Sequence, residues 1–439
     1  MLIFCFEGKI KISMAEQFII NGGKRLKGTI EARGAKNACF PILAATLLTN
    51  EECIIDNIPL IEDVFCLIEI IKSLGKEVEW IKKRTLRITQ KSPLDAKKIN
   101  QKLVSKLRGS VLLLGPLLAR CKTIRFAQPG GCVIGARPIS THLDAFSQLG
   151  VDIGEEVTEQ AEYFRLEIKN KSADEIILNE FSVTATENAL LFASALPKKT
   201  IIKAADCDYS TQELVKFLNK MGAKIKAFGS HNFSVVGRKK LSGAKHKILN
   251  DPIEAGTFIL MAAATRSDII VKNVEISYLE FPLKRLRDFG LPIEIIGKDK
   301  VRVKQWASFR MEKVQAMPFP GIPTDLLPLF GVLATQAEGT TLLHDPLYDG
   351  RLRYLNELNK MGAQIIFADP HRAIINGPTT LRGVTVDSPD LRGGASLIVG
   401  ALLAKGETVI NNIYQIDRGY ERIEERLQKL GADIRRVQS

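Results

Sequence analysis

Hydrophobic and polar positions along the chain repeat a pattern in which a helix is followed by strands. An amphipathic helix ends in an apolar residue and a glycine, and alternation typical of a strand follows, as in residues 223–227 and 363–367. Glycine suits this place because it adopts the left-handed conformation that ends a helix. A unit of about seventy residues therefore recurs six times. The six glycines are Gly75, Gly150, Gly222, Gly290, Gly362 and Gly431.

Each unit also contains an earlier helix that is apolar nearly all round and rich in Ala, Gly and Leu. A helix without a polar face is predicted to be buried, whereas the amphipathic helix, as in residues 420–430, is predicted to face solvent. A unit is thus expected to run strand, buried helix, strand, amphipathic helix, strands. The buried helices are predicted at residues 37–48, 109–119, 183–196, 255–265, 326–336 and 393–404.

The two ends of the chain share the sixth unit in this scheme. Only one strand fits after Gly431, while the N-terminus supplies two unassigned strand-like segments, 17–21 and 28–32. We infer that the N-terminus completes the sixth unit. The chain is then an α/β protein of two three-unit domains, 36–249 and 14–35 with 250–439, which it links near residues 34–35 and 249–252. Residues 1–13 are expected to be an extension, because Met14 begins the first segment that fits the pattern.

Composition is that of an ordinary globular chain of 439 residues, long enough for two domains. Seven cysteines without a CxxC pair argue against zinc and disulfides and favour a reducing compartment. No apolar run is long enough for a membrane span. Without a P-loop or dinucleotide fingerprint, neither ATP hydrolysis nor hydride transfer is indicated, and no cofactor is expected. A net charge of +13 fits a solvated basic surface or attraction of small polyanions, and nucleic acid with less support.

Polar residues gather at the starts of the helices in each unit. Lys and Arg at a helix N-terminus oppose its dipole, which a bound anion offsets. Symmetry between units would bring these residues to facing ends of the two domains. Helix capping by Ser182 or Asp325, and pairing of Arg418 with Asp417 or Arg392 with Asp390, are the alternatives. The cations expected to line an anion-binding cleft are Lys36, Arg108, Arg137, Arg351, Arg392 and Arg418.

A glycine-rich segment, AQPGGCVIGARP at residues 127–138, predicts a flexible loop that carries a thiol. Arg137 follows Cys132 closely, and a nearby guanidinium favours the thiolate and binds anions. The alternative is a buried cysteine beside a turn, which is the usual state of a free cysteine.

Five segments together resemble one enzyme family. GAKNA at 34–38, PGGCVIGARP at 129–138, FPGIPTD at 319–325, DLRGGASL at 390–397 and IDRGYERIEERL at 416–427 are similar to the UDP-N-acetylglucosamine 1-carboxyvinyltransferases, which are enolpyruvyl transferases. The resemblance extends over essentially all of residues 15–437. The fold it implies, two inverse α/β barrels of three repeated units each, agrees with the repeat pattern.

The resemblance implies a cytoplasmic enzyme that transfers enolpyruvate from phosphoenolpyruvate to the 3′-hydroxyl of UDP-N-acetylglucosamine and releases phosphate, at the first step of peptidoglycan synthesis. It implies a monomer or weak homo-oligomer with no nucleic-acid or membrane partner, and alkylation of Cys132 by fosfomycin.

The resemblance also assigns roles to residues. Lys36, Arg137 and Arg418 would hold the phosphate, and Arg351 and Arg392 the carboxylate. Asp325 would take the hydroxyl proton and Cys132 would donate a proton and form a covalent adduct. The remaining substrate-binding residues would be Asn37, Arg108, Ser182, Val183 and Leu347.

The third unit departs from the family pattern. Glu180 stands where the family has a basic residue, Thr184 where it has glycine, and residues 206–210 differ as well. The alternatives are therefore a paralogue that binds a sugar nucleotide without turnover, an enzyme with another acceptor, and, with least support, the shikimate-pathway enolpyruvyl transferase.

Overall fold

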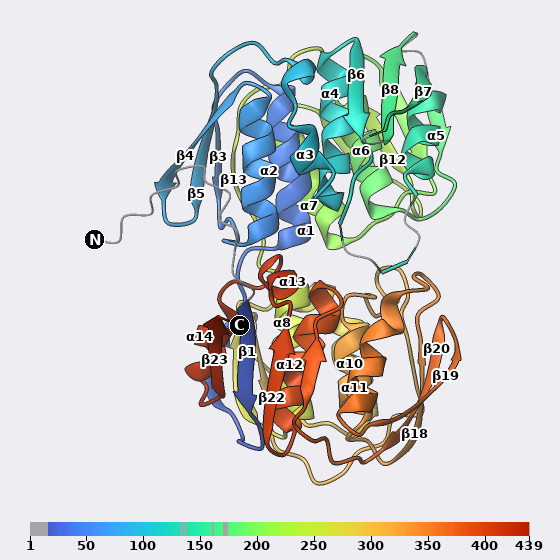
Figure 1. Ribbon diagram of the computed structural model, residues 1–439. Coiled ribbons are helices and arrows are strands. Elements are labelled where there is room, and N and C mark those ends of the chain that lie inside the picture. The colour runs from blue at the N-terminus through green and yellow to red at the C-terminus, as the bar shows by residue number, and fades with distance from the viewer. Residues whose placement is uncertain (1–15, 132–133, 136–137, 160–161, 170–173, 439) are drawn as a thin grey trace.

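The computed structural model describes residues 16–131, 134–135, 138–159, 162–169 and 174–438. Figure 1 shows two bodies, one above the other. The upper body contains α1 to α7 and β3 to β13, and the lower body contains α8 to α14, β14 to β23 and the N-terminal strands β1 and β2. In the part of the chain that the structure describes, no helix is both long and apolar enough to cross a membrane.

The six sheets follow one plan. The first and second strands of a unit are parallel, and the fourth strand lies antiparallel between the second and the third. In the described ranges the second sheet has three strands and the others four. In spatial order, the upper sheets are β13 (Lys245–Lys247), β3 (Cys53–Asp56), β5 (Thr85–Gln90) and β4 (Lys76–Lys82); β6 (Thr123–Ala127), β8 (Glu162–Ile168) and β7 (Val151–Val157); β9 (Glu175–Ile177), β10 (Lys199–Lys203), β12 (Phe233–Val236) and β11 (Lys224–Ala227).

The lower sheets show how the N-terminus joins the repeats. Strand β1 takes the fourth-strand place of the sixth sheet, as predicted, but β2 is the first strand of the fourth sheet and lies parallel to β14. The two N-terminal strands therefore serve different units. The lower sheets are β2 (Lys27–Glu31), β14 (Asp268–Lys272), β16 (Lys300–Val303) and β15 (Ile293–Ile296); β17 (Lys313–Gln315), β18 (Gly339–His344), β20 (Arg372–Gly377) and β19 (Gln364–Asp369); β21 (Thr385–Asp387), β22 (Glu407–Asn411), β1 (Glu16–Asn21) and β23 (Asp433–Gln438).

Six helices without a polar face form the cores, and every residue of α8 is buried. Small and apolar side chains allow these helices to pack closely, and α10 contacts both α8 and α12. The predicted second buried helix is in fact a 3₁₀ helix, η3 (Arg108–Leu113), continued by an α-helix. The buried α-helices are α1 (Lys36–Ala45), α4 (Leu114–Arg120), α6 (Val183–Ala193), α8 (Pro252–Ala264), α10 (Leu327–Ala334) and α12 (Leu391–Leu403).

The amphipathic helices end as predicted, each before a glycine in the left-handed region, with φ between 83° and 104°. The last of them is shorter than expected, because Arg422 has a φ of 41° and separates it from the short helix α13 (Tyr414–Asp417). The amphipathic helices are α2 (Glu62–Ser73), α5 (Ser140–Gln148), α7 (Tyr209–Lys220), α9 (Glu280–Asp288), α11 (Tyr354–Lys360) and α14 (Ile423–Gln428); α3 (Gln101–Val104) is a single turn.

Two antiparallel segments link the bodies. Gly34 forms a β-bridge with Asn250, and the Ala35 N–H donates to the Leu249 carbonyl at 2.9 Å. Gly34 has no room for a side chain, since a Cβ would lie 1.7 Å from the carbonyl oxygen of Asn57. We propose residues 36–249 and 14–35 with 250–439 as the two domains, which these pairings and the separate sheets support.

Candidate active site

A carboxylate joins two of the expected cations across the junction of the bodies. Asp63, in the first turn of α2, accepts from Lys36 Nζ at 2.7 Å and from Arg418 Nε at 2.9 Å. Lys36 begins α1 in the upper body, and Arg418 follows α13 in the lower body. Burial alone would raise the pKa of Asp63, but the charges of Lys36 and Arg418 outweigh it and lower that pKa. Asp63 is therefore ionised and holds the two cations together.

A second carboxylate holds two further expected cations. Asp325 Oδ1 accepts from Arg351 Nη2 at 3.0 Å, and Asp325 Oδ2 lies 3.1 Å from Arg392 Nε and 3.0 Å from its Nη2. Burial would raise the pKa of Asp325, but Arg392, Arg351 and Lys36 together hold it well below the usual range. Because the charge of Lys36, a member of the first cluster, contributes to lowering the pKa of Asp325, the two clusters lie near each other.

Neighbouring polar groups fix both guanidinium groups. Arg351 Nε donates to the Thr324 hydroxyl at 3.1 Å, and Arg351 Nη1 lies 3.8 Å from Asp390. Arg392 Nη1 donates to the Tyr420 hydroxyl at 3.1 Å. Arg351 therefore stays aimed at Asp325 through Nη2, and Arg392 through Nε and Nη2. The alternative pairing of Arg392 with Asp390 is wrong for the side chain, because Asp390 accepts from the backbone N–H of Arg392 as the N-cap of α12.

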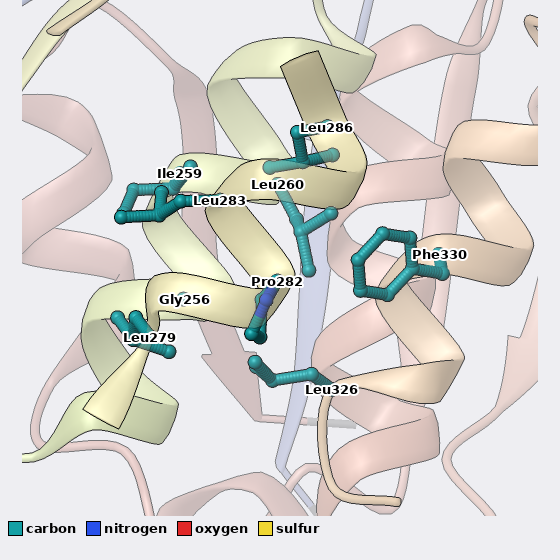
Figure 2. Close-up of a pocket in the computed structure, with 9 residues that line it drawn as sticks. All are labelled: Gly256, Ile259, Leu260, Leu279, Pro282, Leu283, Leu286, Leu326 and Phe330. Atoms are coloured by element: carbon teal, nitrogen blue, oxygen red, sulfur yellow. The ribbon is translucent and has the colours of Figure 1, made fainter. Parts of the chain in front are cut away.

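Close packing positions the start of α10. Asp325 is not a helix cap, and the chain enters α10 through Leu326, whose side chain is fully buried against α8. Leu326 and Phe330 line a small apolar pocket together with Gly256 of α8 and leucines of α9 (Figure 2), and its volume is about 10 Å³. A Cβ on Gly256 would lie 2.7 Å from Leu326 Cδ1, so glycine permits this approach.

The loop expected to carry the thiol reaches the lower body. Cys132 and Arg137 themselves lie outside the described residues. On the N-terminal side, Gly131 has a φ of 125°, and a Cβ there would lie 2.6 Å from Cβ of Arg108. Within the loop, the Ile134 carbonyl accepts from the Gly350 N–H at 3.0 Å, immediately before Arg351. The loop therefore extends toward the Asp325 cluster.

The remaining expected residues occupy the starts of helices and a loop. Arg108 begins η3 and donates through Nη2 to the Pro138 carbonyl at 3.0 Å, and Asn37 lies in the first turn of α1. Ser182 caps α6 by accepting from the Ala185 N–H at 3.4 Å, and Val183 is the first residue of that helix. Leu347 is an exposed residue of the segment before Arg351. Arg108, Ser182 and Val183 are thus all in the upper body, at the starts of η3 and α6.

A buried histidine of α5 bonds to two residues of α6. His142 Nδ1 lies 2.9 Å from Asn188 Nδ2, whose amide orientation is fixed because Asn188 Oδ1 accepts from the Gly115 N–H. Nδ1 is therefore an acceptor, and Nε2 carries the proton and donates to the Thr184 hydroxyl at 3.1 Å. The neutral imidazole therefore joins α5 to α6, and Asn188 joins α6 to α4.

The pH dependence of folding should reveal this neutral histidine. Burial, with a contribution from Arg108, lowers the pKa of His142 from 6.5 to about 3. The unfolded chain takes up the proton near pH 6.5 and the folded chain does not, so His142 costs the fold about 1.4 kcal/mol per pH unit as pH falls from 6.5 toward 3. His142→Gln should be less stable than wild type near pH 7, and the gap should narrow by about 2–3 kcal/mol at pH 4.5. Urea unfolding at each pH measures this, and a pH-independent gap would contradict it.

Several residues of the site were not identified from the sequence. Asp63, Tyr420 and Asp345, whose carboxylate lies 4.0 Å from Arg351 Nε, received no role, and Asp390 was considered only as an alternative partner of Arg392. Asp390 and Tyr420 do lie within the quoted motifs, two residues before Arg392 and two after Arg418. Asp417 pairs with Arg436 at 2.7 Å rather than with its neighbour Arg418. The arrangement offers four fixed cations, two ionised carboxylates and a loop, which suits a small substrate with more than one anionic group.

Comparisons with known proteins point to one family. The sequence model of the family described as EPSP synthase (3-phosphoshikimate 1-carboxyvinyltransferase) matches residues 20–427. A UDP-N-acetylglucosamine 1-carboxyvinyltransferase of Treponema denticola is 40% identical over 426 residues, which cover 95% of this chain and 98% of that protein. UDP-N-acetylglucosamine 1-carboxyvinyltransferase 1 of Carboxydothermus hydrogenoformans is also 40% identical, over 96% of this chain and 98% of that protein.

Solved structures show the same fold. The enolpyruvyl transferase NikO from Streptomyces tendae superposes with a TM-score of 0.85 at 24% identity, over 97% of this chain and 99% of that chain. An EPSP synthase from Acinetobacter baumannii gives a TM-score of 0.71 at 18% identity, over 97% of this chain and 100% of that chain.

Proposed function

Because this chain belongs to the family of EPSP synthase and the UDP-N-acetylglucosamine 1-carboxyvinyltransferases, we propose that it transfers enolpyruvate from phosphoenolpyruvate to the 3′-hydroxyl of UDP-N-acetylglucosamine and releases phosphate. The fold predicted from the sequence, two inverse α/β barrels of three units each, is confirmed by the likeness to other enolpyruvyl transferases. The observation that carries the proposal is Asp325 bound by Arg351 and Arg392 beside the Lys36–Asp63–Arg418 cluster.

The proposed roles follow the charge of the donor. Phosphoenolpyruvate has a carboxylate and a phosphate on one carbon, and fixed cations are needed on both sides. Arg351 and Arg392 present guanidinium forks that suit the carboxylate. Lys36 and Arg418, with Arg137, would hold the phosphate. Each pair is held together by its own carboxylate, Asp325 for the arginines and Asp63 for Lys36 and Arg418.

The proposed reaction is an addition followed by an elimination. Cys132 gives a proton to the vinyl methylene while the 3′-oxygen bonds to the neighbouring carbon and Asp325 takes the hydroxyl proton. Loss of a methyl proton and of phosphate then restores the double bond in the product. The cations stabilise the tetrahedral intermediate, which keeps both anionic groups. Asn37 would orient the acceptor, and Arg108, Ser182, Val183 and Leu347 would contact the substrates.

The setting of the reaction is part of the proposal. We propose a cytoplasmic location, which the proposed role in peptidoglycan synthesis and the cysteine pattern support. We propose a monomer or weak homo-oligomer. The third-unit departures bear on the acceptor, because both lie close to Ser182 in the sequence and both bond to α5: Glu180 accepts from the Thr141 hydroxyl at 3.0 Å, and Thr184 bonds to His142.

An assay of the purified chain tests the function. Incubation with phosphoenolpyruvate and UDP-N-acetylglucosamine should release phosphate and yield a product with the mass of the enolpyruvyl adduct, in equal amounts. UDP-glucose, which lacks the N-acetyl group, is the matched acceptor control. Phosphate at background with every UDP-amino sugar would overturn the proposal, and tight UDP-sugar binding without phosphate release would favour the non-catalytic paralogue.

A further inference from the structure

Asp325 covers the donor groups of the two arginines assigned to the substrate carboxylate. Each of its oxygens is used, Oδ1 by Arg351 and Oδ2 by Arg392. Both guanidinium groups also have partners within the protein: Arg351 Nε donates to Thr324, Arg392 Nη1 donates to Tyr420, and Arg351 Nη1 lies 3.8 Å from Asp390. The carboxylate of an incoming substrate therefore meets arginine N–H groups that already donate to Asp325.

Exposure shows from which side a ligand can reach this cluster. The arginine side chains are 3% and 4% exposed, whereas that of Asp325 is 25% exposed. Asp325 is thus the member of the cluster that faces open space. Asp63 also holds two cations, but its side chain is only 8% exposed.

We propose that Asp325 is an internal competitor for the substrate carboxylate, and that donor binding to Arg351 and Arg392 displaces it toward the acceptor hydroxyl. This inference rests on the proposed function, which makes phosphoenolpyruvate the donor. No bond is made or broken in this step, since one carboxylate replaces another at the guanidinium groups.

Displacement explains how a weak base becomes useful. The pKa of Asp325 lies well below its usual range, chiefly through Arg392 and Arg351, and a carboxylate with so low a pKa takes up a hydroxyl proton poorly. When Arg351 and Arg392 bind the carboxylate of phosphoenolpyruvate instead of Asp325, the attractions that lower the pKa of Asp325 are removed. Asp325 therefore becomes a stronger base only when phosphoenolpyruvate is bound. Removal of the proton from the acceptor hydroxyl is thus coupled to binding of phosphoenolpyruvate.

The test is the affinity for phospholactate, which has the donor's carboxylate and phosphate but no vinyl group. Isothermal titration should show that Asp325→Asn binds phospholactate about tenfold more tightly than wild type, because a charged competitor is removed. Asp268→Asn is the matched control: it makes the same change of net charge at a carboxylate bound by Arg302 on the surface of β14, and it should bind phospholactate no more tightly. Inorganic phosphate, which lacks the carboxylate, should bind wild type and Asp325→Asn within about twofold of each other.

Several results would overturn the inference. If Asp325→Asn binds phospholactate no more tightly than wild type does, Asp325 does not compete with the substrate carboxylate. If Asp325→Asn binds inorganic phosphate more tightly by the same factor, the effect is one of general charge. Denaturation midpoints establish that each variant is folded, and Asp325→Ser repeats the test if Asp325→Asn is not. Wild-type turnover is measured in parallel: its absence contradicts the proposed function, whereas the order of phospholactate affinities still decides the competition.

Discussion

Turnover by Asp325→Asn is expected to fall by about 10²- to 10⁴-fold, the usual contribution of a positioned general base. The amide keeps the size of the side chain and one oxygen toward the arginines, but it cannot take the hydroxyl proton. The measurement is steady-state phosphate release at saturating phosphoenolpyruvate and UDP-N-acetylglucosamine. The KM for phosphoenolpyruvate should fall together with kcat, because the same change removes the competing carboxylate.

The matched control for this variant is Asp268→Asn. Asp268 is also bound by an arginine, through Arg302 Nε at 2.9 Å and Nη2 at 2.8 Å, but on the partly exposed surface of β14. It should retain wild-type turnover. A kcat of Asp325→Asn within about threefold of wild type would exclude Asp325 as the base.

Asp251→Ala is expected to cost about 2–4 kcal/mol of the free energy of unfolding, because one carboxylate serves both bodies. Asp251 Oδ1 caps α8, accepting from Ile253 N at 2.8 Å and Glu254 N at 3.2 Å, while Oδ2 accepts from Lys36 N at 3.1 Å. Loss of a cap costs about 1 kcal/mol, and an unpaired buried N–H adds about 1–3 kcal/mol. Urea unfolding measures the total.

Two substitutions separate these contributions. Asp251→Ser keeps a cap for α8 but is too short for the bond to α1, and it should recover about 1 kcal/mol. Asp95→Ala removes an N-cap that accepts from Lys97 N in an exposed hydrogen bond, and it should cost less than about 1 kcal/mol. Equal losses for Asp251→Ala and Asp95→Ala would show that the bond between the bodies contributes nothing. Asp251→Ala should also lower turnover, since Lys36 begins α1, the helix that loses its hydrogen bond to Asp251.

Local patterns were sufficient for most of the fold. The glycines that end the amphipathic helices all have the expected left-handed conformation, because that requirement lies within one turn of the chain. The apolar helices were found because a helix with no polar face has to be buried. The break at Arg422 was missed, since residues 420–430 keep helical periodicity through it. For the site, the motifs identified the cations and Asp325, but not Asp63 and not the pairing of Asp325 with Arg351 and Arg392.

The amino-acid sequence by itself determined the six units, their two kinds of helix and the placing of cations at helix starts, because each depends on neighbours within a few residues. The tertiary structure alone decided that β2 pairs with β14, that Asp63 joins Lys36 to Arg418, and that Asp325 holds Arg351 and Arg392. Periodicity records which face of an element is buried but not which distant element covers it. Ion pairs between residues hundreds of positions apart leave no local pattern, so only the folded chain assigns their partners.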